Sequence, residues 1–284
     1  MFKREYLKNT PASFQWQTTP LQIYDLGFLK TQIKFPLPML CADYNFLFYI
    51  REGCIAQQIG TEKYRIEANS LVFISTGTVS ALEKISNDVK GYFLLIEDEA
   101  MSVLFNQEEL LNVFMIDPVL KLKIVESEWI YSISKLIFTE LGAQSPNMHI
   151  GNSLVQALLN KILHLSEKDK SLSRTEQIAI QFKQLVHKNF TDQKKISFYA
   201  TTLAVSENYL NRCVKTVFNK SCKEIIIEIA LLNSQILLAN ISKSISEISY
   251  ELNFEDPSYF ARLFKKFASC TPSEYRMKLM HDLS

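Results

Sequence analysis

Apolar and polar residues follow two different patterns along the chain. From about Leu21 to Ile96, short runs alternate apolar and polar side chains between turn residues, which is typical of half-buried β-strands. From about residue 98 onwards, apolar residues recur at spacings of three and four, which is typical of helices. The pattern therefore predicts an α+β fold, with the strands first and the helices after them.

The N-terminal pattern contains six clear strand candidates. Gly60-Thr61 is predicted to be a hairpin turn between two of them, and many short strands with close turns favour a sandwich or a barrel. The six runs are TQIKF (31–35), NFLFYI (45–50), GCIAQQIG (53–60), EKYRIEA (62–68), SLVFIS (70–75) and GYFLLIE (91–97).

Two helical stretches follow, at about residues 98–116 and 126–166. The second carries a stripe of apolar residues at helical spacing: Leu154, Leu158, Ile162 and Leu165. Such a stripe is either part of the core or a surface that pairs with another molecule. Our hypothesis is that residues 1–170 dimerise through it. The polar run SEKDKSLSR (166–174) has no apolar anchors and indicates a linker between domains.

The C-terminal part contains an internal repeat. SENYLNRCVKT (206–216) matches DPSYFARLFKK (256–266) at an offset of fifty residues. A repeat of this kind indicates two copies of one supersecondary unit. The matched pairs include Tyr209 with Tyr259, Arg212 with Arg262 and Lys215 with Lys265.

Each copy is predicted to be a short helix, a tight turn and a second helix. The helices are expected at 197–203 and 207–218 in the first copy, and at 245–252 and 257–267 in the second. This is the pattern of a helix-turn-helix, whose second helix enters the major groove of DNA. An apolar helix at 222–240 would join the copies; it would span about 28 Å, close to the roughly 34 Å between successive major-groove faces.

The block that ends the chain is the most specific. It reads F-x-D-P-S-Y-F-x-R-x-F-K-K (254–266), followed by T-P-S-E-Y-R (271–276). With LAVSENYLNRCVK (203–215) and LLNSQILLAN (231–240), it resembles the DNA-binding domain of the AraC/XylS family of transcription regulators over about residues 172–280. The resemblance implies an all-α domain of seven helices with two helix-turn-helix units, and contact with RNA polymerase.

The chain departs from this family in two places. Where the family often has glycine, the chain has Asn219, Asn253 and Ser269. Asparagine adopts positive φ more readily than serine, so we expect the helix that ends at Ser269 to be built differently. Ile227, Ile229 and Ala230 stand where the family often places basic residues. The connecting helix is therefore expected to make fewer phosphate contacts.

The N-terminal strands resemble, over about residues 20–97, the cupin-like sensor barrel of many AraC-family regulators. The segment FYIREGCIAQQIGTEKYRIEANSLVFISTGTVS (48–80) carries this likeness. The barrel segment has no histidine, so we predict neither a metal site nor a cofactor. Its aromatic residues indicate a mostly apolar cavity for a small organic effector. The candidate lining residues are Phe46, Phe48, Tyr49, Tyr64 and Phe73.

Composition and charge are compatible with these two domains. The chain has 284 residues, of which 47% are hydrophobic, enough for two cores. Its net charge is +1, with the basic surplus after residue 174, on the part that would meet phosphate. Five scattered cysteines indicate free thiols. Without an apolar run of about eighteen residues or an apolar signal-peptide segment in the first sixteen residues, we expect a cytoplasmic protein with no membrane contact.

Together these patterns predict a sequence-specific transcription regulator, an activator and a homodimer, with no catalytic site. The predicted domains are 1–166 for sensing and dimerisation, a linker at 167–174, and 175–284 for binding DNA. Since Arg can pair with guanine and Asn with adenine, the first copy is expected to read bases in more detail. The predicted contacts with a double-stranded operator are Asn208, Asn211, Arg212 and Lys215 in the first copy and Pro257, Ser258, Ala261, Arg262, Lys265 and Lys266 in the second.

Two alternatives stay open at this stage. One is a regulator that senses no small molecule and is controlled through protein contacts. The other is a small-molecule- or carbohydrate-binding barrel protein, or an enzyme, with no DNA role. Binding of DNA by residues 172–284 alone would exclude the second.

Overall fold

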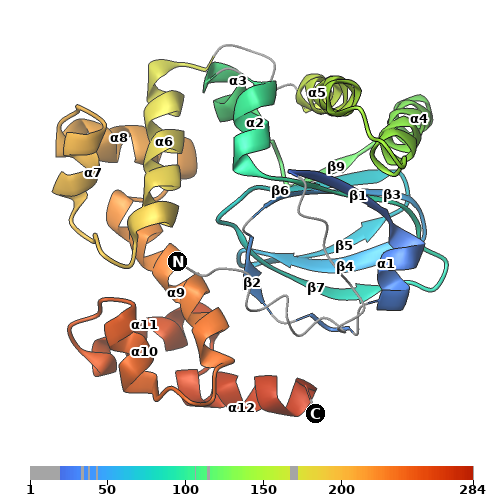
Figure 1. Cartoon of the computed structure of the whole chain (residues 1–284). Helices are drawn as coiled ribbons and strands as arrows, with labels where there is room; N and C mark the ends of the chain where they lie inside the picture. Colours follow the sequence, from blue (N-terminus) through green and yellow to red (C-terminus); the bar gives the residue numbers. More distant parts are fainter. Residues whose placement is uncertain are drawn as a thin grey trace. The chain divides into compact units, whose positions relative to one another are not determined.

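The computed structural model describes residues 20–32, 35–37, 39–42, 44–105, 107–113, 116–166 and 172–283. The chain divides into two compact units, Met1–Ser171 and Leu172–Ser284 (Figure 1). The predicted linker at 167–174 lies mostly outside the described residues, and Arg174 already begins the first helix of the second unit. The first sixteen residues also lie outside them.

The first unit contains two antiparallel sheets in its described part. One has the strand order β1-β8-β3-β6-β9 and the other β2-β7-β4-β5. Apolar side chains from both sheets meet between them in a continuous core. The strands are β1 Leu21–Asp25, β2 Leu40–Cys41, β3 Asn45–Glu52, β4 Cys54–Ile59, β5 Glu62–Glu67, β6 Ser70–Ile74, β7 Val79–Ile85, β8 Lys90–Ile96 and β9 Val119–Lys121.

Helices cover the other face of the first sheet, as Figure 1 shows for α4 and α5. Successive side chains of a strand point to opposite faces, so Leu47 and Tyr49 of β3 pack toward the helices in a second core. This arrangement confirms the predicted α+β class. The helices of this unit are α1 Leu26–Gln32, α2 Asp98–Leu104, α3 Gln107–Val113, α4 Ile124–Leu141 and α5 Met148–Leu165.

The strand predictions are partly right. Five of the six runs are strands, and Gly60 takes a φ of 57° in the turn between β4 and β5. The run TQIKF is wrong, since its first two residues end α1 and residues 33 and 34 lie outside the described part. Strand β7 was missed because Val79–Leu82 are all buried, so this stretch does not alternate.

The apolar stripe of α5 is core. Leu158 and Ile162 are 1% and 0% exposed, and Leu154 and Leu165 pack against the same cluster. The hypothesis that residues 1–170 dimerise through this stripe is therefore wrong, because a side chain buried in its own unit cannot contact a second molecule. Sequence spacing alone could not tell a core stripe from a pairing surface.

The second unit consists, over residues 172–283, of seven helices around one core, as the resemblance implies. Cys213 and Cys222 lie inside it, and burial raises the pKa of Cys222 to about 12. All five cysteines of the chain are free. The helices are α6 Arg174–Asn189, α7 Ile196–Thr202, α8 Glu207–Phe218, α9 Cys222–Leu238, α10 Ile245–Glu251, α11 Pro257–Ala268 and α12 Pro272–Leu283.

Local capping residues set the ends of these helices. Capping boxes open α6 at Ser173 and α10 at Ser244, and the Asp256 side chain accepts from the Ser258 N–H at the start of α11. Asn219 ends α8 at a φ of 54° and Ser269 ends α11 at 59°. The expectation that the end at Ser269 is built differently is therefore wrong.

Candidate nucleic-acid interface

The two copies of the repeat have the same backbone geometry. The turns place Ala204 and Asn253, forty-nine residues apart, at φ values of 53° and 57°. The backbone N–H after each of these residues donates to the carbonyl of a small buried residue in the first helix of its copy. This hydrogen bond is 3.0 Å long from Val205 to Ala200, and the equivalent one in the second copy is 2.9 Å long. The repeat seen in the sequence is thus a repeat in three dimensions. Only the left-handed Ala204 was not foreseen, since alanine rarely takes this conformation.

Each second helix has one buried and one exposed face. Leu210 of α8 and Phe260 of α11 are 0% exposed and hold their helices in the core. On the exposed face, an arginine lies beside a tyrosine one turn earlier. The Cζ of Arg212 is 5.0 Å from the centroid of the Tyr209 ring, and the matching pair in α11 is 5.9 Å apart. The rings restrict the guanidinium groups, which lowers the entropy lost when they bind.

Most of the predicted DNA contacts lie on these exposed faces. In the described part of the chain, none of the five cationic side chains among them forms a salt bridge. They are therefore available to an anionic partner. Exposed are Asn208, Asn211, Arg212, Lys215, Ser258, Arg262, Lys265 and Lys266, whereas Pro257 and Ala261 are half-buried.

Asn211 has a structural role that the sequence did not indicate. Its Oδ1 accepts a hydrogen bond of 3.0 Å from the backbone N–H of Cys222, the first residue of α9. The first N–H groups of a helix have no partner within the helix, so Asn211 satisfies one of them and ties α8 to α9. The matching residue of the second copy is Ala261, which cannot do this.

Replacing Asn211 with alanine is expected to lower the free energy of unfolding of the second unit by about 1 kcal/mol, because the Cys222 N–H loses its acceptor. Base preferences should stay as in the parent protein. Chemical denaturation and binding to single-base operator variants measure the two effects. Asn208→Ala, an exposed asparagine of the same helix, is the matched control and should not change stability. A loss of base preference with unchanged stability would contradict the capping role.

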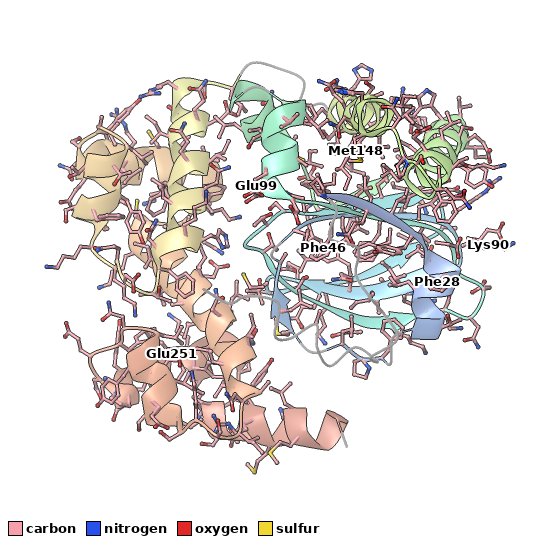
Figure 2. All side chains as sticks on the ribbon, in the orientation of Figure 1. Phe28, Phe46, Lys90, Glu99, Met148 and Glu251 are labelled. Atoms are coloured by element: carbon pink, nitrogen blue, oxygen red, sulfur yellow. The ribbon has the colours of Figure 1, made fainter. Side chains whose placement is uncertain are left out.

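The five predicted effector residues do not form one site. Phe46, Phe48 and Tyr64 lie with the core between the sheets, where Figure 2 shows Phe46. Tyr49 and Phe73 pack on the opposite face toward the helices. Phe48 and Tyr49 are neighbours in β3 and must point to opposite faces, so they could not line the same cavity.

The core between the sheets contains one polar side chain that the prediction missed. Gln57 is 2% exposed, and its Oε1 has no hydrogen-bond partner among the described residues. It pairs in register with Tyr64 of β5. The sequence signal is that Gln57 shares the inward phase of Ile55 and Ile59.

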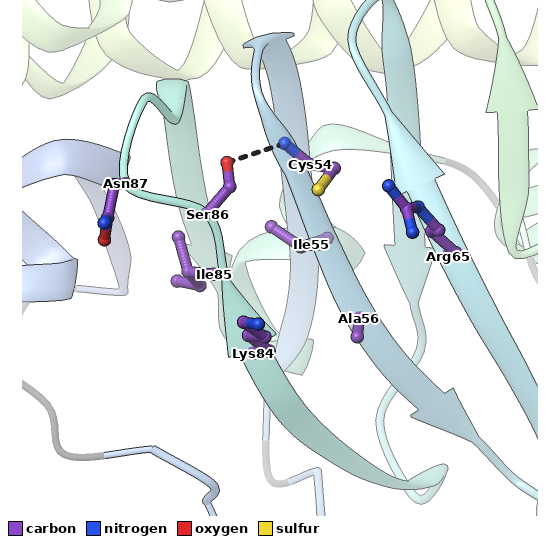
Figure 3. Close-up of a pocket in the computed structure, with 8 residues that line it drawn as sticks. All are labelled: Cys54, Ile55, Ala56, Arg65, Lys84, Ile85, Ser86 and Asn87. Atoms are coloured by element: carbon purple, nitrogen blue, oxygen red, sulfur yellow. Dashed lines mark hydrogen bonds between the residues drawn. The ribbon is translucent and has the colours of Figure 1, made fainter.

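A separate hollow of about 330 Å³ lies on the second sheet, and its lining side chains are drawn in Figure 3. Arg65 and Lys84 give it two cations, and the Ser86 hydroxyl accepts from the Cys54 N–H over 2.9 Å. None of the predicted effector residues lines it. Over the described ranges, no cluster of His, Cys, Asp or Glu could hold a metal ion, and no helix is long and apolar enough to cross a membrane.

A doubled helix-turn-helix with an exposed cationic face on each second helix defines a DNA-binding protein. A family model described as "Helix-turn-helix domain" matches residues 199–278. Over these residues the chain resembles the DNA-binding domain of AraC/XylS-family transcription regulators.

Similar proteins support this assignment. The chain is 29% identical over 147 residues to the Msm operon regulatory protein of Streptococcus mutans, covering 49% of this chain and 53% of that protein. It is 21% identical over 262 residues to the HTH-type transcriptional activator RhaR of Mannheimia succiniciproducens, covering 86% and 89%. The chain spans about half the length of the first curated relatives it matches.

Among solved structures, that of ToxT from Vibrio cholerae O395 aligns with 92% of this chain and 98% of its own, at 16% identity and a TM-score of 0.49.

Proposed function

We propose that the protein activates transcription by binding a double-stranded operator through α8 and α11, which enter successive major grooves. The observation that carries the proposal is the repeated tyrosine–arginine pair, in which each arginine is exposed and forms no salt bridge with a described residue. Arginine can bind guanine through two hydrogen bonds, so two equivalent arginines suit two half-sites. Activation and contact with RNA polymerase rest on the family resemblance and on relatives such as RhaR. The proposed binding of DNA supports a cytoplasmic location for the protein.

We further propose that residues 1–166 sense a small organic effector and form a homodimer, while residues 175–284 bind DNA. The effector would bind between the sheets among Phe46, Phe48 and Tyr64, with no metal or cofactor. Tyr49 and Phe73 would not contact it. The buried Oε1 of Gln57, which lacks a donor, would accept a hydrogen bond from a hydroxyl or amide group of the effector.

The dimer surface that we propose is the exposed face of α4. Val125, Trp129 and Leu136 are 82%, 39% and 57% exposed, and their spacing of four and seven places them on one side of the helix. A second copy of the chain would bury them, in place of the α5 stripe.

Selection of bound duplexes from random DNA tests the DNA function of the full-length protein. We expect enrichment of a site with two half-sites about 10 base pairs apart, because the recognition helices would meet successive major grooves. A footprint on the recovered duplex should show both half-sites protected. Failure to enrich any sequence, at low salt and with a positive control regulator, would contradict the proposal.

A further inference from the structure

Lys194 lies where the two helix-turn-helix copies touch. It stands in the loop between α6 and α7, just before the first copy begins. Its Nζ is 3.4 Å from the centroid of the Phe254 ring, and Phe254 lies in the turn between α10 and α11 of the second copy. This contact therefore joins the loop before the first copy to the turn of the second copy, in addition to the link through α9.

The surroundings of Lys194 make it an unusual place for a cation. Its Nζ is buried and has no hydrogen-bond partner in the described part of the chain. The nearby charged residues of both turns, Asp192, Lys195, Glu255 and Asp256, form no ion pair with it. Burial alone lowers the pKa of Lys194 to about 8. The face of the Phe254 ring is thus the group that stabilises the ammonium.

Burial of the charged form of Lys194 opposes folding. The folded-state pKa of about 8 is below the ordinary lysine pKa of about 10.4. The unfolded chain therefore binds more protons between these values, and stability rises with pH across that window. Near neutral pH the buried ammonium therefore costs stability.

Both ends of the contact are fixed by the core. On one side, the Tyr199 hydroxyl donates to the carbonyl of Gln193 over 2.5 Å, and Tyr199 is 0% exposed. On the other side, the Phe254 ring is 6.5 Å from the Tyr259 ring, which lies beside Arg262. A line of contacts thus runs from the loop before the first copy to the arginine that faces the groove in the second.

We propose that Lys194 is a positioning residue for DNA recognition. Through Phe254 it fixes α11 relative to α8, so that both recognition helices meet the operator in register. The proposal rests on the proposed DNA-binding function. It assigns a specificity role to a residue outside both recognition helices.

Lys194→Met tests this, since methionine has a similar length and no charge. In the full-length protein at pH 7, we expect the dissociation constant for the selected two-site duplex to rise roughly tenfold, because the cation–π contact is lost. Stability in chemical denaturation should stay equal or rise. Lys194→Arg, which keeps a cation, should restore most of the affinity. Lys195→Met removes the exposed neighbouring charge and is the matched control.

Two readouts separate positioning from a merely structural role. The parent protein should lose affinity when one base pair is inserted between the half-sites, whereas Lys194→Met should discriminate less between the two spacings. The parent should also lose affinity as pH rises through 8, since Lys194 becomes neutral. The Lys194→Met variant should keep its affinity as pH rises through 8. It retains Lys183, another lysine whose pKa is lowered by burial.

The outcomes are distinguishable from failure of the proposed function. If the parent protein selects no DNA, the function itself is wrong. If the parent binds and Lys194→Met matches it in affinity, spacing preference and pH profile, the positioning role is overturned. Lower affinity together with lower stability would also overturn it, because it would assign Lys194 to folding alone.

Discussion

Replacing Leu158 with glutamate is expected to unfold the first unit rather than to separate a dimer. Leu158 is 1% exposed in the core shared by α4, α5 and the first sheet. Truncating a buried leucine already costs about 2–5 kcal/mol, and burying a carboxylate without a partner costs several more. This exceeds much of the roughly 5–15 kcal/mol that stabilises a typical domain. Circular dichroism and denaturation of the full-length protein would show the loss of one transition.

Leu136→Glu is the matched control for this variant. Leu136 is 57% exposed on α4, so the fold should persist. If the exposed face of α4 pairs with a second copy, the mass in sedimentation equilibrium should fall toward that of a monomer. A folded Leu158→Glu protein that only loses its partner would restore the rejected hypothesis about the α5 stripe.

Replacing Arg212 or Arg262 with alanine is expected to lower operator affinity by about 1–3 kcal/mol, which is roughly 5- to 150-fold. Each arginine is exposed on its recognition helix beside a tyrosine, and we propose that each binds one guanine. The preference for one or two base pairs should relax in one half-site for each variant. Titrations against single-base operator variants measure both changes. Unchanged base preferences in either variant would show that the corresponding arginine does not read bases.

Lys266→Ala provides the contrast. Lys266 is exposed next to Lys265 near the end of α11, where it is expected to contact phosphate. Its loss should weaken binding to all sequences alike and reduce the slope of the salt dependence by about one unit.

Because Asn211 caps α9, fewer free side chains remain to support the prediction that the first copy reads bases in more detail.

The sequence by itself determined most of the second unit. Helix α8 begins and ends where the pattern predicts, because its N-cap at Ser206 and its left-handed end at Asn219 are chosen by neighbouring residues. Hydrogen bonds within a helix and at its N-cap join residues two to four positions apart. The internal repeat contains the same local signals in both copies. The two helix-turn-helix units could therefore be predicted from the residues alone.

The tertiary structure decided which surfaces are covered and which side chains are free. The α5 stripe has the same spacing whether it faces a sheet or a second molecule, and only the packing of distant strands buried Leu158. Strand alternation separates Phe48 from Tyr49, but the core that each one joins depends on which sheet or helix lies opposite. Asn211 and Lys194 have partners eleven and sixty residues away, Cys222 and Phe254. Contacts between residues so far apart leave no periodic pattern in the sequence, so they emerge only when the whole chain is folded.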